Sequence, residues 1–491
     1  MNDTKKRANL KTGGPWRTRF APSPTGDMHL GNARTAVLNW LLARQSNGTF
    51  LVRLEDTDRD RSSFRAEASI LDTLAWMGIE PDEPVVRQSG RLSLYRQACE
   101  ALVASGHAYP CFCTEQELDA ERERARAENR APRYSGKCSG ALREAGLNRM
   151  RNGEPHTIRF RVPDNEQVTF TDLLKGEMTV PSGAFGDFVI LRSSGWPSYN
   201  LAVVVDDADM DINLVLRGED HLTNTARQIL LYRALDLAEP HFAHHGLLLN
   251  EERKKLSKRH GAKSVRQLRD EHLSPLSLIH YLASLARGIK AKKIVAGAAD
   301  LARQFNPFSL GRGGVVFSEM ELHNLSQAYW HGLPPQTVLA EAAPFLTRLE
   351  GWKEIDQGHK DELISAVQEN MASPADLPDL LRFFLSPELT YSRQAIAGLR
   401  SPASASVITA LDEVLKKVDT APELPVAQEF RTTLFSEIST ISGARGKQLY
   451  HPLRHILTGT DQGPELKTLV EFLPLQWMRE RTRAALELAI P

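Results

Sequence analysis

The sequence predicts an α/β fold in which a parallel sheet is split by an α+β insertion and followed by an all-α C-terminal half. Short apolar runs alternate with amphipathic stretches near the N-terminus, and the same alternation resumes far downstream. The stretch between them is rich in Arg and Glu and then in short β-type runs. After residue 263, nearly every segment has the periodicity of an amphipathic helix.

The sheet is predicted from two groups of elements. The first is a strand at 18–21, a turn-rich loop at 22–27, a helix at 32–44 and a strand at 50–54. The second is a strand at 213–216, a helix at 223–235 and a strand at 244–249. An order of strand, helix and strand implies parallel pairing with a right-handed crossover, which makes the sheet Rossmann-like.

The insertion and the helical half have elements of their own. The insertion has a helix at 115–130 and strands at 157–162 and 188–191, and the apolar run at 201–205 has the length of a core strand. The helical half is predicted as amphipathic helices broken by Pro and Gly, at 268–287 and over nearly all of 318–491. We therefore divide the chain into a disordered tail at 1–15, the first half of the Rossmann-like domain at 16–110, the insertion at 111–197, the second half of that domain at 198–262, a helical domain at 263–330 and a second α-helical domain at 331–491.

Composition excludes several classes of protein. The 491 residues include 61 Lys+Arg and 61 Asp+Glu, so bulk charge gives no reason to expect a polyanionic partner. No apolar run approaches the roughly 18 residues that a membrane-spanning helix needs, and the polar N-terminal tail lacks a secretory apolar region. Four cysteines in so long a chain do not form a disulfide framework. We expect a cytoplasmic protein.

The loop between the first strand and the first helix has features of a phosphate-binding loop. Pro22 and Pro24 stiffen it, Gly26 and Gly31 allow close approach of a ligand, and the helix that follows directs its positive N-terminal end at the same place. His29 could then hydrogen-bond a triphosphate and stabilise charge that develops on its α-phosphate. The alternative is a Pro- and Gly-rich turn with a surface histidine.

A second candidate loop lies at 254–259 and is densely cationic. Its lysines, Lys255 and Lys258 among them, could follow a leaving pyrophosphate as mobile point charges, which is a form of electrostatic catalysis. The alternative is a solvated basic turn, the usual interpretation of an isolated charge run.

Together the two loops resemble the paired motifs of the class I aminoacyl-tRNA synthetases, which have the forms His-x-Gly-His and Lys-Met-Ser-Lys-Ser. Here they read His-Leu-Gly-Asn at 29–32 and Lys-Leu-Ser-Lys-Arg at 255–259. The sequence departs from the family pattern at Asn32, Leu256 and Arg259. Because Asn32 cannot carry a positive charge, its role would be limited to hydrogen bonding.

Further motifs narrow the resemblance to the glutamyl and glutaminyl branch of that class. They lie at 19–26, 52–58 and 214–220, with a weaker one at 446–454. Glutaminyl enzymes carry β-barrels in their C-terminal part, whereas this chain has predicted helices there. The sequence is therefore similar to the bacterial-type glutamyl-tRNA synthetases.

The resemblance implies two sites. An amino-acid site would contain Arg19, Ala21, Ser23, Glu55, Tyr199 and Arg217. An ATP site would contain His29, Gly31, Asn32, Asp220, Leu248, Lys255, Ser257, Lys258 and Arg259, with His29, Lys255 and Lys258 as the catalytic residues. In the first site the two arginines would face carboxylates, Glu55 would bind the α-amino group and Tyr199 would donate its hydroxyl. Val203 stands where some relatives have Asn.

The resemblance also implies a reaction and its partners. Glutamate would attack the α-phosphate of ATP, bound with Mg²⁺, and the glutamyl group would pass to the 3′ end of tRNA(Glu), with tRNA(Gln) open as an additional or alternative acceptor. The segments at 111–197, 263–330 and 331–491 would bind the acceptor end, the stem and the anticodon, and we expect a monomer. Three alternatives remain: a relative that attaches glutamate to a base in tRNA, a non-acylating nucleotidyltransferase and a non-catalytic RNA-binding paralogue.

The cysteines allow a separate prediction. Cys111, Cys113 and Cys138, together with Tyr134, could hold one tetrahedral Zn²⁺, as in a shortened glutamyl-tRNA synthetase relative that this arrangement resembles. The alternative is three reduced thiols. Cys99 is interpreted as a small packed residue. The adjacent pair at 244–245 lies on a predicted strand and should point to opposite faces, which argues against a shared metal.

Overall fold

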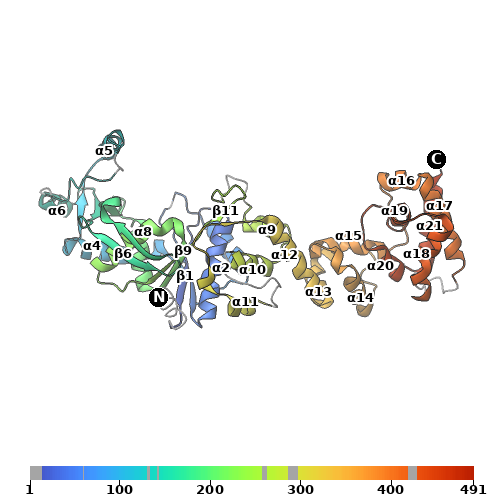
Figure 1. The fold of residues 1–491 in the computed structure, drawn as a ribbon. Coiled ribbons are helices and arrows are strands. Elements are labelled where there is room, and N and C mark those ends of the chain that lie inside the picture. The colour runs from blue at the N-terminus through green and yellow to red at the C-terminus, as the bar shows by residue number, and fades with distance from the viewer. Residues whose placement is uncertain are drawn as a thin grey trace. The chain divides into compact units, whose positions relative to one another are not determined.

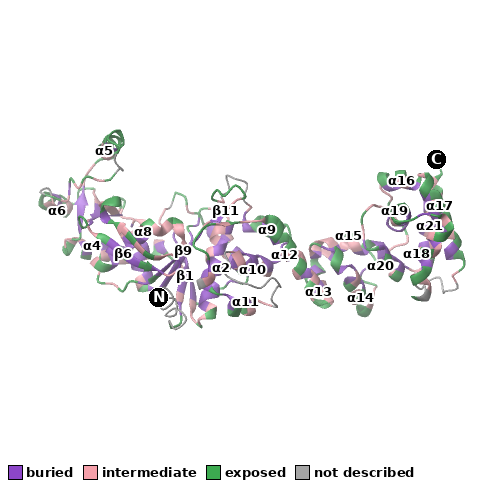
Figure 2. Ribbon diagram, viewed as in Figure 1, coloured by how far each residue is buried: buried purple, intermediate pink, exposed green. Residues whose placement is uncertain are grey.

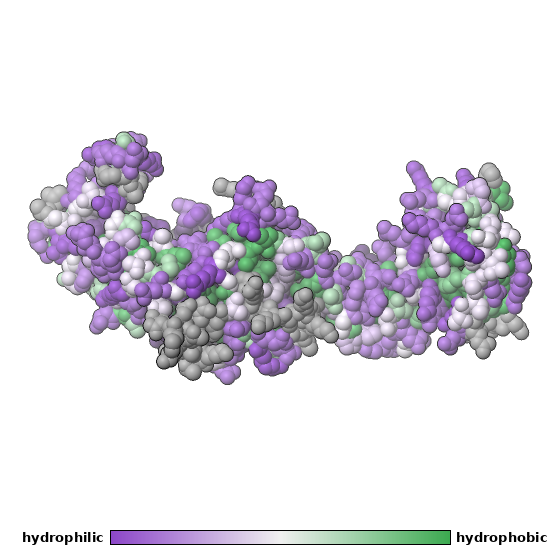
Figure 3. All heavy atoms as spheres, viewed as in Figure 1, coloured by the Kyte–Doolittle hydropathy of each residue, from purple (hydrophilic) through white to green (hydrophobic). Residues whose placement is uncertain are grey.

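The computed structural model describes residues 14–58, 60–129, 133–140, 143–256, 263–285, 297–418 and 428–490. The chain divides into two compact units (Figure 1). One comprises residues 1–271 and 275–322, and the other comprises 272–274 and 323–491. In the space-filling view of Figure 3, hydrophilic side chains cover most of the visible face of each unit.

A parallel three-stranded sheet begins the first unit. Its strands are β1 (Arg17–Phe20), β2 (Thr49–Leu54) and β3 (Val86–Arg87), in that order. Helix α2 (Leu30–Gln45) connects β1 to β2 and is buried over most of its length, because apolar residues occur on nearly all its sides (Figure 2). Helix α3 (Phe64–Trp76) follows β2 and is capped by Ser63, whose hydroxyl accepts the backbone N–H of Ala66.

A second sheet has the strand order β7-β6-β10-β9. Strands β9 (Leu214–Gly218) and β10 (His241–His245) are parallel and connected by α8 (Leu222–Ala234), while α7 (Tyr199–Asp209) precedes β9. The two sheets meet where β1 lies beside β9, and the backbone N–H of Asn213 donates to the carbonyl of Arg17 at 3.3 Å.

The hairpin of β6 (Gln167–Asp172) and β7 (Gly176–Pro181) extends this second sheet. Phe242 of β10 pairs in parallel with Asp172 of β6, so part of the stretch expected to form the insertion continues the sheet. Three other strands form a separate antiparallel sheet, in the order β4 (Ala108–Cys111), β5 (Thr157–Phe160) and β8 (Phe188–Leu191). Helices α4 (Leu92–Ala104) and α6 (Arg143–Arg151) contact β4, and α5 (Glu115–Ala127) follows β4 in the chain.

The first unit ends in short elements. They are β11 (Leu248–Leu249), α9 (Val265–Asp270), α10 (Pro275–Ser284), α11 (Ala298–Gln304) and β12 (Val315–Val316). Strands β11 and β12 pair in parallel. Ser264 and Gln267 form a capping box that fixes the start of α9.

The elements named among the described residues of the second unit are all helices. Its helices are the C-terminal part of α12 (Glu319–Gly332) and then α13 (Pro335–Leu346), α14 (Gln357–Val367), α15 (Leu377–Leu381), α16 (Arg393–Leu399), α17 (Pro402–Lys416), α18 (Gln428–Ser442), α19 (Lys447–Thr458), α20 (Leu466–Phe472) and α21 (Leu475–Ala489). Val407, Leu411 and Val414 lie on one face of α17 and are buried in the core of this unit. The buried Arg481 of α21 donates to the backbone carbonyls of Phe383, Ser386 and Leu457.

These elements confirm the mixed α/β class with a parallel sheet and a helical C-terminal half, but two local predictions were wrong. The apolar run at 201–205 lies in α7, because an unbroken apolar run fits a buried helix as well as a strand. The strand expected at 244–249 is two strands, since β10 ends at His245 and only Leu248–Leu249 pairs again. The helices broken by Pro that were expected at 268–287 are confirmed over the described residues 268–285, since α9 ends at Asp270 and Pro275 starts α10.

No helix among the residues that the structure describes has both the length and the apolar character needed to cross a bilayer.

Candidate active site

The first unit contains a cavity of about 610 Å³ beside the C-terminal ends of β1, β2 and β9. Its lining brings together the predicted residues Arg19, Ala21, Ser23, His29, Gly31, Asn32, Glu55, Tyr199, Arg217, Asp220, Leu248 and Lys255. Ligands of parallel α/β sheets bind at this end of the strands. The predicted residues Ser257, Lys258 and Arg259 lie outside the described part of the chain.

A buried network of acids and arginines lies behind the cavity wall, to which it contributes Arg19 and Glu55. Nε of Arg19 donates to Oδ1 of Asp207 at 3.0 Å, and Nη1 of Arg53 donates to the same oxygen at 2.5 Å. Nη2 of Arg53 also donates to Oε1 of Glu55 at 3.4 Å. Nε of Arg53 lies 3.6 Å from Asp206. Asp207 therefore carries part of the charge compensation of Arg19, which fixes that guanidinium at the cavity wall.

The two carboxylates of this network titrate in opposite directions. Burial raises the pKa of Glu55, and Arg53 and Arg19 only partly offset that effect. Burial also acts to raise the pKa of Asp207, but Arg19 and Arg53 outweigh it and hold the pKa below its ordinary value. Asp207 is the member whose ionised form is stabilised, whereas the charge of an ionised Glu55 is only partly compensated by the arginines. A carboxylate in that state suits a cationic group of a ligand.

Arg217 projects from β9 and has only neutral hydrogen-bond acceptors in the described part of the chain. Its Nε donates to Nε2 of His244 at 3.2 Å, and its Nη2 donates to Thr225 and Gln228 at 2.7 and 2.8 Å. Burial lowers its pKa, yet an arginine stays charged in a protein. Its fixed and uncompensated positive charge at the cavity wall suits a carboxylate of a ligand.

Tyr199 begins α7 and faces the same region. Its hydroxyl lies 3.1 Å from Nδ1 of His221 and 3.5 Å from Nη1 of Arg217. Burial, reinforced by the charge of Arg217, lowers the pKa of His221 to about 4, so its imidazole is neutral near pH 7. Either neutral tautomer of this ring can form a hydrogen bond with the hydroxyl, which orients the phenol at the cavity wall.

His29 is the N-cap of α2. Its Nδ1 accepts the backbone N–H of Asn32 at 3.2 Å, so a neutral ring carries its proton on Nε2. A Cβ at Gly31 would lie 3.1 Å from this ring, a close contact that would require the imidazole to shift by a few tenths of an ångström. The imidazole N–H and the helix N-terminus are thus presented at one place, as binding of a phosphate requires.

Lys255 lies across the cavity and pairs with Asp220. Nζ of Lys255 donates to Oδ2 of Asp220 at 2.8 Å, and both side chains are largely accessible. The backbone N–H of Leu256 donates to the carbonyl of Leu248 at 2.8 Å, which ties the cationic loop to β11. An accessible ion pair of this kind is weak, so the lysine can exchange its carboxylate for a phosphate at low cost.

Known proteins match the chain over nearly its whole length. Residues 15–324 match the catalytic domain of the class I tRNA synthetases for glutamate and glutamine (E and Q), and residues 337–486 match an anticodon binding domain. The chain is 39% identical to glutamate–tRNA ligase 2 of Syntrophus aciditrophicus, over 96% of this chain and 98% of the relative. It is 40% identical to the glutamate–tRNA ligase of Aquifex aeolicus, with the same coverage.

The chain belongs to the glutamate–tRNA ligase family. It is therefore an enzyme of the ligase class, and the resemblance to the class I synthetases is confirmed. A solved structure of the glutamate–tRNA ligase of Elizabethkingia meningosepticum, in complex with its amino acid, has a TM-score of 0.82 and 27% identity, covering 96% of this chain and 99% of that one. A second, from Elizabethkingia anophelis, has a TM-score of 0.79 and 26% identity.

Three residues in or behind the cavity wall were missed in the sequence. His221 lines the cavity, whereas Asp207 and Arg53 are buried behind it and contact Arg19 and Glu55, and none of the three has a place in the sites that the motifs implied. A signal was present for Asp207, because two acids end the apolar run of α7 and buried acids need cationic partners. His221 directly follows the motif at 214–220, and nothing in its spacing indicated a contact with Tyr199.

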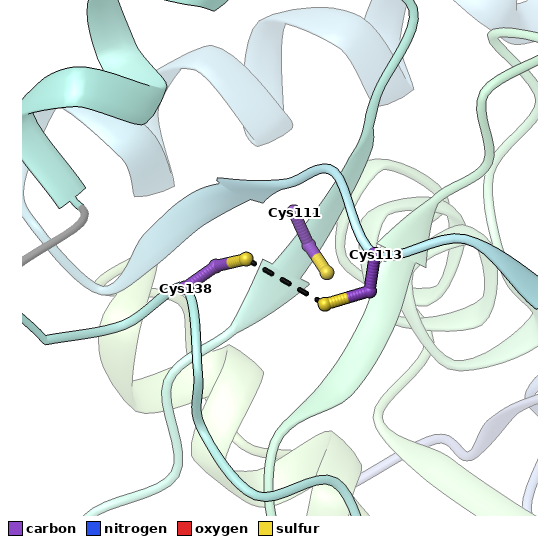
Figure 4. A group of neighbouring side chains, drawn as sticks. All are labelled: Cys111, Cys113 and Cys138. Atoms are coloured by element: carbon purple, nitrogen blue, oxygen red, sulfur yellow. Dashed lines mark hydrogen bonds between the residues drawn. The ribbon is translucent and has the colours of Figure 1, made fainter. Parts of the chain in front are cut away.

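The four predicted metal ligands lie together at the end of β4, apart from the cavity. The three Sγ atoms of Cys111, Cys113 and Cys138 are all within 4.8 Å of one another and point inward (Figure 4). The hydroxyl of Tyr134 lies 3.5 Å from Sγ of Cys111 and 3.4 Å from Sγ of Cys113. Burial opposes ionisation of Cys111, but hydrogen bonding to Tyr134, to the backbone of Cys113 and to Arg159 together outweighs it and lowers the pKa to about 7.

The other histidines and the fourth cysteine have separate surroundings. Cys99 of α4 is buried in the core, as expected of a packed residue, and burial raises its pKa to about 12. Nδ1 of His244 lies 2.5 Å from Oδ2 of Asp172, whereas Nε2 of His245 lies 3.0 Å from Oγ1 of Thr35. The adjacent histidines therefore point to different partners.

Proposed function

We propose that this ligase activates L-glutamate with ATP to form glutamyl-adenylate and pyrophosphate, and then transfers the glutamyl group to the 3′ end of tRNA(Glu). The single observation that carries the proposal is the cavity, because one wall offers the charges complementary to glutamate and the other offers those complementary to a triphosphate. tRNA(Gln) is the second candidate acceptor.

In the amino-acid site, Arg217 and Arg19 would bind carboxylates of the substrate. Arg217 is the stronger anchor, because its hydrogen-bond acceptors are neutral, whereas Arg19 already pairs with Asp207. Glu55 would bind the α-ammonium group and Tyr199 would donate its hydroxyl. Ala21 and Ser23 line the cavity beside them. Two carboxylates and one ammonium group are the charges that distinguish glutamate.

In the ATP site, binding would rest on positioning and charge stabilisation. Nε2–H of His29 and the N-terminus of α2 would donate to phosphate oxygens as charge develops on the α-phosphate. Lys255 and Lys258 would stabilise the pyrophosphate as it leaves. Mg²⁺ arriving with ATP would neutralise phosphate charge. The remaining predicted contacts of this site are Gly31, Asn32, Asp220, Leu248, Ser257 and Arg259.

The second step needs no covalent enzyme intermediate. A hydroxyl of the terminal ribose attacks the carbonyl carbon of the adenylate, and AMP leaves. We propose that 111–197 binds the acceptor end, 263–330 the stem and 331–491 the anticodon, a division that the family match at 337–486 supports for the last segment. We also propose that the ligase works as a monomer in the cytoplasm.

We propose a structural Zn²⁺ at the cysteine cluster. Tetrahedral coordination with Zn–S bonds of about 2.3 Å separates two sulfur ligands by about 3.8 Å, and Sγ of Cys113 lies 3.7 Å from Sγ of Cys138. The residues therefore fit the ion, with Cys111 and Tyr134 as the other ligands. The ion would join β4 to the segment that carries Cys138.

One assay tests the function directly. Purified protein with ATP, Mg²⁺, radiolabelled glutamate and either purified tRNA(Glu) or purified tRNA(Gln) should give acid-precipitable glutamyl-tRNA. The proposal would be contradicted if tRNA is charged only when another labelled amino acid replaces glutamate, or if the protein binds tRNA but charges it with no amino acid. Lys258→Ala should reduce adenylate formation while leaving tRNA affinity largely intact, and an equal loss of both would assign that loop to RNA binding instead.

A further inference from the structure

Behind the proposed glutamate site, three buried side chains form a chain of hydrogen bonds. Oδ2 of Asp172, at the end of β6, lies 2.5 Å from Nδ1 of His244 on β10. Nε2 of the same imidazole lies 3.2 Å from Nε of Arg217 on β9 and 3.1 Å from Oγ1 of Thr225. The side chains of Asp172 and His244 are fully buried, so neither can contact a ligand in the cavity.

The partners of His244 determine its protonation state. Arg217 can only donate, so Nε2 must be an acceptor, and the proton of a neutral ring must be on Nδ1, where the carboxylate of Asp172 accepts it. Burial lowers the pKa of His244, although its hydrogen bond with Asp172 partly offsets the effect. The neutral Nδ1–H tautomer of His244 therefore satisfies the hydrogen bonds with both Asp172 and Arg217.

Asp172 is itself held firmly. Its Oδ1 accepts the backbone N–H groups of Leu174 and Lys175 at 2.9 and 2.8 Å, which leaves Oδ2 for the histidine. The neighbouring cation Lys175 is occupied by Glu219 and by the carbonyl of Arg312. The carboxylate, the turn that follows β6 and the imidazole thus form a fixed support on the far side of Arg217.

We infer that Asp172 and His244 are positioning residues for glutamate binding: the carboxylate selects the Nδ1–H tautomer of His244, and its Nε2 fixes the guanidinium of Arg217 toward the substrate carboxylate. The inference rests on the proposed function, because it assigns Arg217 a substrate carboxylate. It extends the glutamate site to β6, on a hairpin far from the motifs in sequence.

Arg217 would hold the carboxylate equally in the ground state and in the transition state. Loss of its orientation should therefore raise the KM for glutamate and leave kcat nearly unchanged at saturating glutamate. The KM for ATP should stay the same, since the ATP contacts lie on the other wall of the cavity. A purely structural role would instead lower the amount of active enzyme without this selective change.

Asp172→Asn is the first test. The amide keeps an oxygen for the backbone N–H groups of Leu174 and Lys175, but it presents an N–H to Nδ1 of His244, which forces the proton onto Nε2 and directs a donor at Arg217. The KM for glutamate in tRNA charging should rise about tenfold or more, the range for a lost hydrogen bond to a charged group. Glu177→Gln, an exposed carboxyl-to-amide change on β7 of the same hairpin, is the matched control and should match the parent.

A second pair of variants separates positioning from packing. His244→Gln can place an amide oxygen where Nε2 was and should keep the KM for glutamate within about threefold of the parent. His244→Asn reaches Asp172 but not Arg217, and its KM should rise as in Asp172→Asn. Equal impairment of the two variants, or a parental KM for glutamate in Asp172→Asn, would overturn the inference.

The parent is assayed first with glutamate and tRNA(Glu). Failure of the parent to charge tRNA with glutamate refutes the proposed function itself. If the parent charges tRNA but the variants do not show the expected differences in the KM for glutamate, only the positioning role is refuted. Thermal unfolding of every variant identifies any that fail to fold. If Asp172→Asn does not fold, the comparison of His244→Gln with His244→Asn decides.

Discussion

Asp207 accepts the Nε–H of Arg19 at 3.0 Å, and both side chains are almost completely buried. The same carboxylate receives Arg53. Removal of one partner from a buried pair leaves an uncompensated charge, which typically costs more free energy than the intact pair contributes. The acid is therefore needed both for the stability of the first unit and for the placement of Arg19 at the cavity.

Asp207→Asn should destabilise the first unit by about 3 kcal/mol at pH 7. The pKa of Asp207 is lowered in the folded state, so its stabilising effect is complete above the unfolded pKa and is lost as pH falls through the folded pKa. The difference between parent and variant should thus shrink in acid. Thermal unfolding followed as a function of pH measures it.

Asp211→Asn is the control for this change. Asp211 is exposed and has a positive φ of 53°, a conformation that Asn adopts readily. Its unfolding midpoint should equal that of the parent at every pH. An equal loss of stability in both variants would mean that the pair of Asp207 with the arginines is not what stabilises this region.

Glu55→Gln should raise the KM for glutamate at least tenfold at pH 7, because the amide cannot compensate the charge of the α-ammonium group. Burial raises the pKa of Glu55, so its anionic form should be lost at a higher pH than that of an exposed glutamate. In the parent, kcat/KM for glutamate should fall on the acid side as Glu55 is protonated. If kcat/KM for glutamate falls on the acid side in the same way in Glu55→Gln, the protonation responsible belongs to another group.

The sequence predicted the motif loops because their chemistry is local. His29, its glycine neighbour and the helix start lie within a few residues of one another, and all of them line the cavity. The parallel sheet and the helical half were predictable for the same reason, since each rests on a local periodicity.

Other parts of the site depend on contacts between distant segments. Arg19 and Asp207 are 188 residues apart, and Asp172 and His244 are 72 residues apart. No local pattern selects one buried acid among many as the partner of a given arginine. The apolar run at 201–205 shows a similar limit, because its neighbours in space, rather than its own residues, decide that it is helical.

Tyr199→Phe should raise the KM for glutamate several-fold with little change in the KM for ATP. The hydroxyl lies 3.1 Å from His221 and 3.5 Å from Arg217, so its loss removes one donor at the amino-acid wall and an acceptor of Arg217. Steady-state tRNA charging with either substrate varied gives both constants.

Tyr232→Phe is the matched control for that change. Its hydroxyl is buried, and no hydrogen-bond partner for it exists among the described residues. Its removal should therefore leave both KM values unchanged and leave stability equal or slightly higher. A rise in the KM for glutamate in Tyr232→Phe as large as in Tyr199→Phe would show that loss of any nearby hydroxyl disturbs the site.

The cysteine cluster gives a prediction that is independent of catalysis. Protein expressed with sufficient metal should contain one zinc per chain. Cys138→Ser should lose most of it, because the loss of one thiolate ligand lowers the affinity of the site for zinc. Tyr134→Phe keeps three thiolates and should bind zinc more weakly than the parent but more tightly than Cys138→Ser. Elemental analysis after dialysis against a chelator measures the zinc that each of the three proteins retains and so ranks their affinities.

Cys99→Ala is the control, because it removes a cysteine that lies in a different core and should keep the full zinc content. A zinc content far below one per chain in the parent would refute the zinc site and favour the alternative of three reduced thiols. A Tyr134→Phe variant that keeps zinc as firmly as the parent would leave the thiolates as ligands and assign the fourth position to water. In that case the hydroxyl, 3.0 Å from the backbone nitrogen of Cys138, would only brace the loop that carries this ligand.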